Sequence, residues 1–125
     1  SRSTPPALRA TSPAELGRRA EPPAFFVAAR GHHADVGGVQ PGSMPPFSRT
    51  LADEGVLLDA LPVMRDGALL EADIRSAFAA GPHPSRDVDR NLADLTAQLA
   101  ACQAGATAVT AMIAEHGRPT VEAYM

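Results

Sequence analysis

A long alanine-rich stretch between Asn91 and His116 constrains the fold more than any other part of the chain. Asn91 is a typical N-cap, and Gly117 followed by Pro119 is a typical helix stop. The pattern therefore predicts one continuous helix of roughly 40 Å. Apolar side chains recur within it at helical spacing, and we expect them to be buried as one stripe: Leu92, Leu95, Leu99, Cys102, Val109, Met112 and Ile113.

Two further features belong to this helix and its end. Gly105 lies inside the helix, where a glycine costs about 1 kcal/mol relative to alanine. The close approach of another backbone would explain a glycine there. Beyond the stop, Thr120 predicts the cap of a last segment from Val121 to Met125.

The first half of the chain predicts strands rather than helices. The apolar run Ala24–Ala29 predicts a buried strand. Residues 30–48 contain so many glycines and prolines that they predict an ordered loop or a series of turns. Val56–Leu58 and Leu61–Met64 predict strand pieces, closed by a turn at Asp66-Gly67.

The remaining pattern completes an α+β fold. Leu69–Ala80 predicts a helix that stops at Gly81-Pro82 and carries one apolar stripe, formed by Leu70, Ile74 and Phe78. We therefore expect a few short strands, a long irregular loop and a long helix that packs across them. We assign 24–125 to part of one domain. Residues 1–23 hold five prolines and four arginines, and they predict an atypical, disordered leader with few contacts to the rest.

Composition limits the partners and the compartment. The net charge of -3 argues against nucleic acid or an anionic membrane as the main partner. No uninterrupted apolar run approaches the roughly 18–20 residues of a membrane-spanning helix, and no signal-peptide pattern precedes Phe25. The single cysteine, Cys102, cannot form an internal disulfide, so we expect a reducing, cytoplasmic location. Because the chain lacks a starting methionine, we expect it to be a fragment.

The stretch from Gly31 to Gly38 holds the densest cluster of chemically active side chains. His32 and Asp35 are three positions apart between glycines, so an imidazole and a carboxylate can face one cation. The glycines allow the backbone to approach a ligand closely. A structural alternative remains, in which the histidine is capped by backbone and the aspartate closes a turn. We predict that His32 and Asp35 point into one concave site at the end of the Ala24–Ala29 strand.

Two other groups carry polar side chains that suit substrate binding. The rigid loop Pro41–Pro46 offers the Ser43 hydroxyl and several amides, which either hold a small amide or anion or simply form turns. Asn91, Asp94 and Gln98 form a second stripe beside the apolar face of the long helix. Capping accounts for the first two. Gln98 is left to bind substrate or to hold a loop, unless the stripe is only a polar boundary face.

The stretch Phe25–Pro46, which reads FFVAARGHHADVGGVQPGSMPP, resembles the hydantoinase B family, and within it the C-terminal half of ATP-dependent 5-oxoprolinases. The resemblance continues through Glu54–Val56 and Arg90–Gln98, and it reaches Val121–Met125. It covers about four-fifths of the chain in order. It implies part of a larger enzyme that opens cyclic amides such as 5-oxoproline or hydantoins. ATP would be bound by a hydantoinase A-type subunit or domain.

The resemblance also implies roles for particular residues. It implies a divalent metal ion held by His32 and Asp35. Members of the family carry a further His and Asp before the first strand, whereas residues 1–23 contain neither, so the metal site would lack ligands. Near the metal we expect catalytic roles for His33, Glu54 and Gln98, and substrate-binding roles for Gly37, Gly38, Ser43 and Asp94.

Two alternatives to the cyclic-amide hydrolase stay open. One is a subunit of the acetone carboxylase alpha type, a relative with a metal in the equivalent region. The other is a truncated, non-catalytic remnant that only binds partner subunits. In every case we expect this chain alone to be inactive, because it has no recognisable nucleotide-binding motif.

Overall fold

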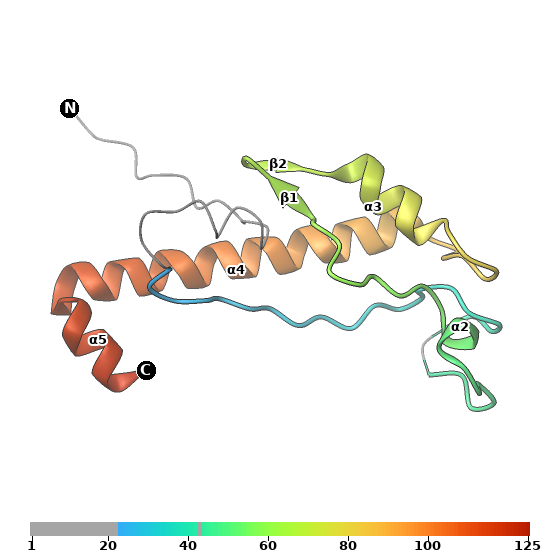
Figure 1. Cartoon of the computed structure of the whole chain (residues 1–125), viewed down its shortest axis with the longest axis horizontal. Helices are drawn as coiled ribbons and strands as arrows, with labels where there is room; N and C mark the ends of the chain where they lie inside the picture. The colour runs from blue at the N-terminus through green and yellow to red at the C-terminus, as the bar shows by residue number, and fades with distance from the viewer. Residues whose placement is uncertain (1–22, 43) are drawn as a thin grey trace.

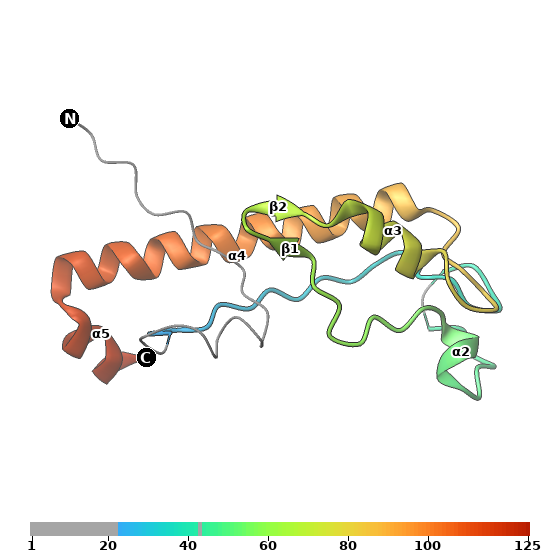
Figure 2. The ribbon, with the colours of Figure 1, turned by 45° about the horizontal axis from the view of Figure 1, so that its top comes forward.

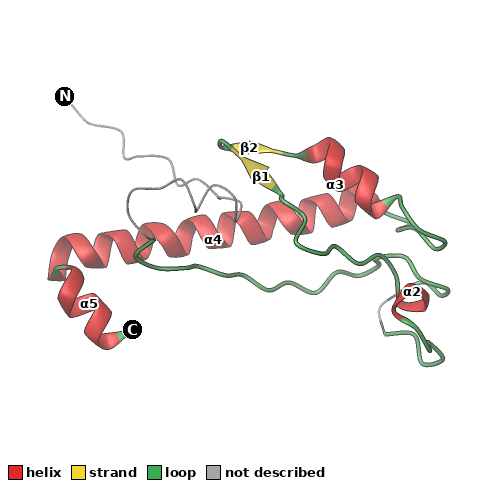
Figure 3. Ribbon diagram, in the orientation of Figure 1, coloured by secondary structure: helices red, strands yellow, loops and turns green. Residues whose placement is uncertain are grey.

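A computed structural model describes residues 23–42 and 44–125, and one long helix runs along the length of the molecule (Figure 1). The expectations for residues 1–22 and for Ser43 lie outside the described part. This long helix is α4 (Val88–His116). The other elements are the short helices α2 (Leu51–Glu54), α3 (Glu71–Phe78) and α5 (Arg118–Tyr124), and a two-stranded sheet of β1 (Met64–Arg65) and β2 (Ala68–Leu69). This mixture confirms the α+β class, and Figure 3 shows how much of the described chain is loop.

Helix α4 is the predicted long helix, and it passes Gly105 without a break. It ends at His116 as expected, where the Gly117 amide donates to the Ile113 carbonyl at 2.9 Å. Its start differs from the prediction. The cap is Asp87, whose carboxylate accepts from the Arg90 amide at 3.0 Å. The assignment of Asn91 as N-cap was wrong, since Asp87 satisfies the exposed amides of the first turn.

The apolar stripe of α4 is only half-buried. Leu95, Leu99 and Cys102 each keep part of their surface accessible, so the expected full burial of these three side chains was wrong. Helices α3 and α5 pack on this helix, and the extended segment after residue 23 runs alongside it (Figure 2). A Cβ atom added at Gly105 would lie 3.0 Å from Val27 Cγ1. The expected close approach at Gly105 therefore exists, but a side chain makes it rather than a backbone.

The buried core lies where α3 meets α4. Ile74 and Phe78 are 0% and 1% exposed, which confirms two of the three residues of the predicted stripe. The third, Leu70, is half-buried and lies at the N-cap, because α3 is shorter than Leu69–Ala80. Burying two such side chains stabilises the fold by roughly 1.5–3 kcal/mol each. A second contact forms at the other end of α4, where Val121 of α5 is buried. Helix α5 begins at Arg118, earlier than the predicted cap at Thr120, with a proline in its first turn.

The predicted turn at Asp66-Gly67 is confirmed. Both residues have positive φ, 52° and 82°, as a tight two-residue hairpin turn between right-twisted strands requires. The turn joins β1 to β2 antiparallel, with Met64 opposite Leu69. The strand predicted at Val56–Leu58 does not form, because within the described residues only β1 and β2 pair as a sheet.

The run Ala24–Ala29 is extended but is not a buried strand. It has no strand partner within residues 23–42 and 44–125, and Phe26 is 81% exposed. This prediction was wrong because an apolar run indicates extended backbone without showing that a neighbouring strand is present.

Helix α4 is also long and apolar enough to cross a membrane, judged by length and composition alone. Its apolar character is spread over many alanines, so no uninterrupted apolar run marks it in the sequence. None of its most apolar window is fully buried among the described residues. One such helix is weak evidence for a membrane span, since core helices pass the same test.

Candidate functional site

The loop after residue 31 is fixed by backbone hydrogen bonds to two distant segments. The Gly38 amide donates to the His83 carbonyl at 3.0 Å, and the Val56 amide donates to the Val36 carbonyl at 2.9 Å. A Cβ atom added at Gly37 would lie 2.2 Å from the His83 oxygen, and one at Gly38 would lie 2.6 Å from the Asp53 oxygen. The close approach that these glycines permit is therefore to protein backbone.

This packing changes the interpretation of the two glycines, which we expected to bind substrate. The Gly37 amide donates to Asp35 Oδ1 at 2.8 Å, and the Gly38 amide is bonded as described above. Both residues are buried. Their amides already have protein acceptors, so a substrate contact would have to displace them.

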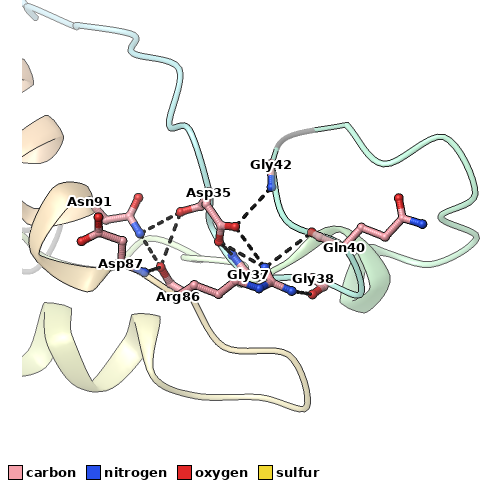
Figure 4. A network of polar contacts seen from close by, with 9 residues as sticks. Asp35, Gly37, Gly38, Gln40, Gly42, Arg86, Asp87 and Asn91 are labelled. Atoms are coloured by element: carbon pink, nitrogen blue, oxygen red, sulfur yellow. Dashed lines mark hydrogen bonds and ion pairs between the residues drawn. The ribbon is translucent and has the colours of Figure 1, made fainter.

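Asp35 is held by an arginine from the connection between α3 and α4 (Figure 4). Arg86 Nη1 lies 3.0 Å from Asp35 Oδ2, and Arg86 Nη2 donates to the Gly38 carbonyl at 2.6 Å. The Gly42 amide donates to the same Oδ2 at 3.2 Å. Asp35 and Arg86 thus hold together the two sides of residues 31–42, the glycine loop. No sequence pattern predicted this role for Arg86.

These contacts determine the ionisation of Asp35. Burial raises the pKa of the Asp35 carboxyl. Hydrogen bonds from the Gly37 and Gly42 amides and the charge of Arg86 lower this pKa by more than burial raises it, so it lies below the ordinary value. The carboxylate is therefore ionised at neutral pH, and its negative charge is balanced by the guanidinium.

His33 lies against the polar stripe of α4. Its Nδ1 atom is 2.8 Å from Asn91 Oδ1 and 3.6 Å from Asp94 Oδ2, and its Nε2 atom is 3.2 Å from Gln98 Nε2. The imidazole also packs beside the Phe78 ring, with the centroids 6.1 Å apart. The three polar residues predicted on one stripe of the helix therefore converge on a single side chain.

Asn91 is the most buried polar residue of this cluster, at 1% exposed. Besides its contact with His33, its Nδ2 atom donates to the Asp35 carbonyl at 2.9 Å and to Ser85 Oγ at 2.6 Å (Figure 4). One amide thus joins the glycine loop, the connection before α4 and α4 itself. Its place on the polar stripe was the only signal in the sequence for this role.

A cavity of about 290 Å³ opens beside the loop, lined mainly by apolar residues together with His32, His33 and Glu54. His32 and Glu54 are exposed, whereas His33 is half-buried. The structure thus brings three of the predicted site residues to one cavity. Asp94 and Gln98 reach it only through their contacts with His33, and Asp35 is not among the lining residues.

The described residues do not by themselves fit a metal ion. Within residues 23–42 and 44–125, no three His, Cys, Asp or Glu side chains come close enough to hold one. The Asp35 carboxylate is already bonded to Arg86, whose positive charge opposes a cation at the same oxygens. The metal-binding roles of His32 and Asp35 remain predictions, and they require ligands from outside the described residues.

Comparison with known proteins identifies the family of this chain. A family profile described as hydantoinase B/oxoprolinase matches residues 11–125. The chain belongs to the hydantoinase B/oxoprolinase family. The matched range begins inside the segment 1–23 that the sequence analysis set apart. No solved structure matches the chain.

Named relatives of this family member are much longer than the chain. The 5-oxoprolinase of Dictyostelium discoideum is 44% identical over 101 residues, which are 81% of this chain and 8% of the relative. The 5-oxoprolinase 1 of Arabidopsis thaliana is 42% identical over 112 residues, 81% of this chain and 9% of the relative. The 5-oxoprolinase of Saccharomyces cerevisiae is 37% identical over 107 residues, 81% of this chain and 8% of the relative. The chain thus spans less than a tenth of their length.

Proposed function

We propose that this chain forms part of the active site of a larger ATP-dependent cyclic-amide hydrolase of the 5-oxoprolinase type. The observation that carries the proposal is the cavity lined by both His32 and Glu54, beside a histidine held by α4, in a chain whose long relatives are named 5-oxoprolinase. ATP would bind to a hydantoinase A-type region or subunit. The small substrate, 5-oxoproline or a similar ring, would enter the cavity.

The cavity residues suit the hydrolytic step. Opening a lactam with water requires a base that takes a proton from the water and an acid that protonates the leaving nitrogen. The Glu54 carboxylate serves as the base. The His32 imidazole serves as the acid, or as a metal ligand if the complete enzyme supplies further ligands. No step in this proposal passes through a metal ion, because the described residues do not fit one. We also propose a cytoplasmic location, supported by the free cysteine Cys102.

The proposal is favoured over the two alternatives. The three relatives described above are named 5-oxoprolinase, which supports a lactam hydrolase rather than a carboxylase subunit. The Asp35–Arg86 pair and the contacts of Asn91 fix the loop beside the cavity at two points, and such preorganisation suits an active site.

A chimera tests the function. The matched segment of the Dictyostelium 5-oxoprolinase is replaced by residues 24–125 of this chain, and ADP release and ring opening of 5-oxoproline are measured. We expect turnover by the chimera and none by the 125-residue chain alone. His32→Ala and Glu54→Gln in the chimera should lower kcat at least tenfold, or by about 1.4 kcal/mol of transition-state stabilisation. His116→Ala, at an exposed site at the end of α4, is the matched control.

Two outcomes would contradict the proposal. A folded chimera that binds ATP but opens no ring would show that this chain is a non-catalytic remnant. A chimera in which His32→Ala and His116→Ala have the same effect would remove His32 from the site.

A further inference from the structure

We infer that Asn91 is a positioning residue that holds His33 in its Nδ1–H tautomer and thereby fixes the loop that presents His32 to the cavity. The functional part of this inference rests on the proposed hydrolase activity. The tautomer itself follows from hydrogen-bond geometry alone.

The orientation of the Asn91 amide is decided by its neighbours. The Asp35 carbonyl oxygen can only accept a hydrogen bond, so the Asn91 atom 2.9 Å from it must be the NH₂ group. The same group lies 2.6 Å from Ser85 Oγ, which accepts from it. The amide oxygen is therefore the atom that faces His33, and it can only accept.

This orientation determines where His33 carries its proton. Asn91 Oδ1 is 2.8 Å from His33 Nδ1, so Nδ1 must bear the hydrogen. In the neutral ring Nε2 then has a lone pair, and the Gln98 NH₂ group at 3.2 Å can donate to it. Gly31 leaves space for this approach, because a Cβ atom there would lie 2.7 Å from Gln98 Nε2.

With both ring nitrogens bonded and its side chain only 14% exposed, His33 has no nitrogen left for a substrate. Its ring beside Phe78 instead fastens the loop to the buried core. Arg86 fastens the same loop through Asp35 two residues further on. His32 follows the extended backbone of this segment and reaches the cavity with Glu54. We thus replace the catalytic role expected for His33 by a positioning role.

Nitrogen-15 NMR of the imidazole rings tests the tautomer in the full 125-residue chain. Spectra are recorded at about pH 8.5, where a free imidazole is neutral. A His33→Gln variant identifies the signals of His33. We expect Nδ1 to show the shift of a protonated nitrogen and Nε2 that of an unprotonated one, the reverse of the preference of a free histidine side chain.

Variants separate Asn91 from its neighbours. Because Asp94 Oδ2 also lies 3.6 Å from His33 Nδ1, Asn91 is tested in an Asp94→Leu background. In that background Asn91→Leu should move the proton of His33 largely to Nε2, whereas Asp94→Leu alone, Gln98→Leu and the exposed control Gln103→Leu should leave it on Nδ1. The wild-type spectrum decides the question even if the Asn91→Leu variant fails to fold. A wild-type His33 protonated at Nε2, or an unchanged tautomer in the folded double variant, would overturn the inference.

The same substitution in the chimera tests the functional part. Asn91→Leu should lower kcat at least tenfold with a smaller change in KM, since His32 is displaced while the cavity residues from 44 to 57 stay in place. Full kcat in a variant whose tautomer has switched would refute the positioning role. An inactive wild-type chimera would refute the proposed function and leave the tautomer result standing.

Discussion

Replacing Gly37 by alanine tests whether the glycine loop is fixed by backbone packing. Gly37 has φ +95°, and a Cβ atom there would lie 2.2 Å from the His83 oxygen and 2.8 Å from the Pro84 carbonyl carbon. Gly42 of the same loop has φ +92° with nothing within 4 Å of its added Cβ atom. An alanine at either position would therefore adopt an unfavourable positive φ. Only at Gly37 would its Cβ atom also collide with the backbone of residues 83 and 84.

The magnitude follows from that difference. Positive φ costs an alanine roughly 1–2 kcal/mol at either position. At Gly37 the backbone must also move away from His83, which breaks the Gly38–His83 and Gly37–Asp35 hydrogen bonds at about 1 kcal/mol each. We expect Gly37→Ala to cost about 2 kcal/mol more than Gly42→Ala, or roughly a 30-fold difference in the folding equilibrium.

Urea unfolding followed by far-UV circular dichroism measures both variants against the wild-type chain. Gly37→Ala should lower the midpoint clearly further than Gly42→Ala, with an unchanged slope. Equal losses from the two substitutions would show that the loop moves at no cost and would refute the argument that it is rigidly packed.

Three further substitutions test the Asp35–Arg86 ion pair, the buried core at Phe78 and the cap of α4 at Asp87. Arg86→Gln should raise the pKa of Asp35 toward its ordinary value because it removes the guanidinium, and carbon-13 NMR of the carboxyl would measure that pKa. In the wild-type chain the folded pKa of Asp35 is depressed. The contribution of Asp35 to stability is therefore present above the ordinary Asp pKa of about 3.9 and is lost as the pH falls below that value. Phe78→Ala should lower the free energy of unfolding by about 3–5 kcal/mol, whereas Phe47→Ala, at a side chain 79% exposed, should change it by less than about 0.5 kcal/mol. Asp87→Ala should cost about 0.5–2 kcal/mol of stability in a urea titration, and no loss would contradict its assignment as the cap of α4.

Sequence patterns predicted the elements that are determined by interactions between residues close together in the chain. The body and stop of α4, the turn at Asp66-Gly67 and the buried face of α3 follow from residues within a few positions of one another. The start of α4 was misplaced because Asn91 and Asp87 are both good capping residues. Propensity cannot decide between two such residues so close together.

The site depends on contacts that no local pattern contains. His33 and Asn91 are 58 residues apart, and Arg86 and Asp35 are 51 residues apart. Most of the polar residues that meet here could be predicted from the sequence, but not which of them bond to one another. Asp35 was therefore predicted to bind a metal and Gly37 a substrate, whereas in the structure both are bonded within the protein.

The single amide of Asn91 has a consequence for folding kinetics. Closing a loop of 58 residues between His33 and α4 costs roughly 4 kcal/mol of chain entropy. We expect the helix of α4 to form first, within about a microsecond, and the loop to dock only after α3 has packed on it. Substitutions at Asn91 or Arg86 should therefore speed unfolding and leave the folding rate nearly unchanged, which is the signature of contacts absent from the transition state.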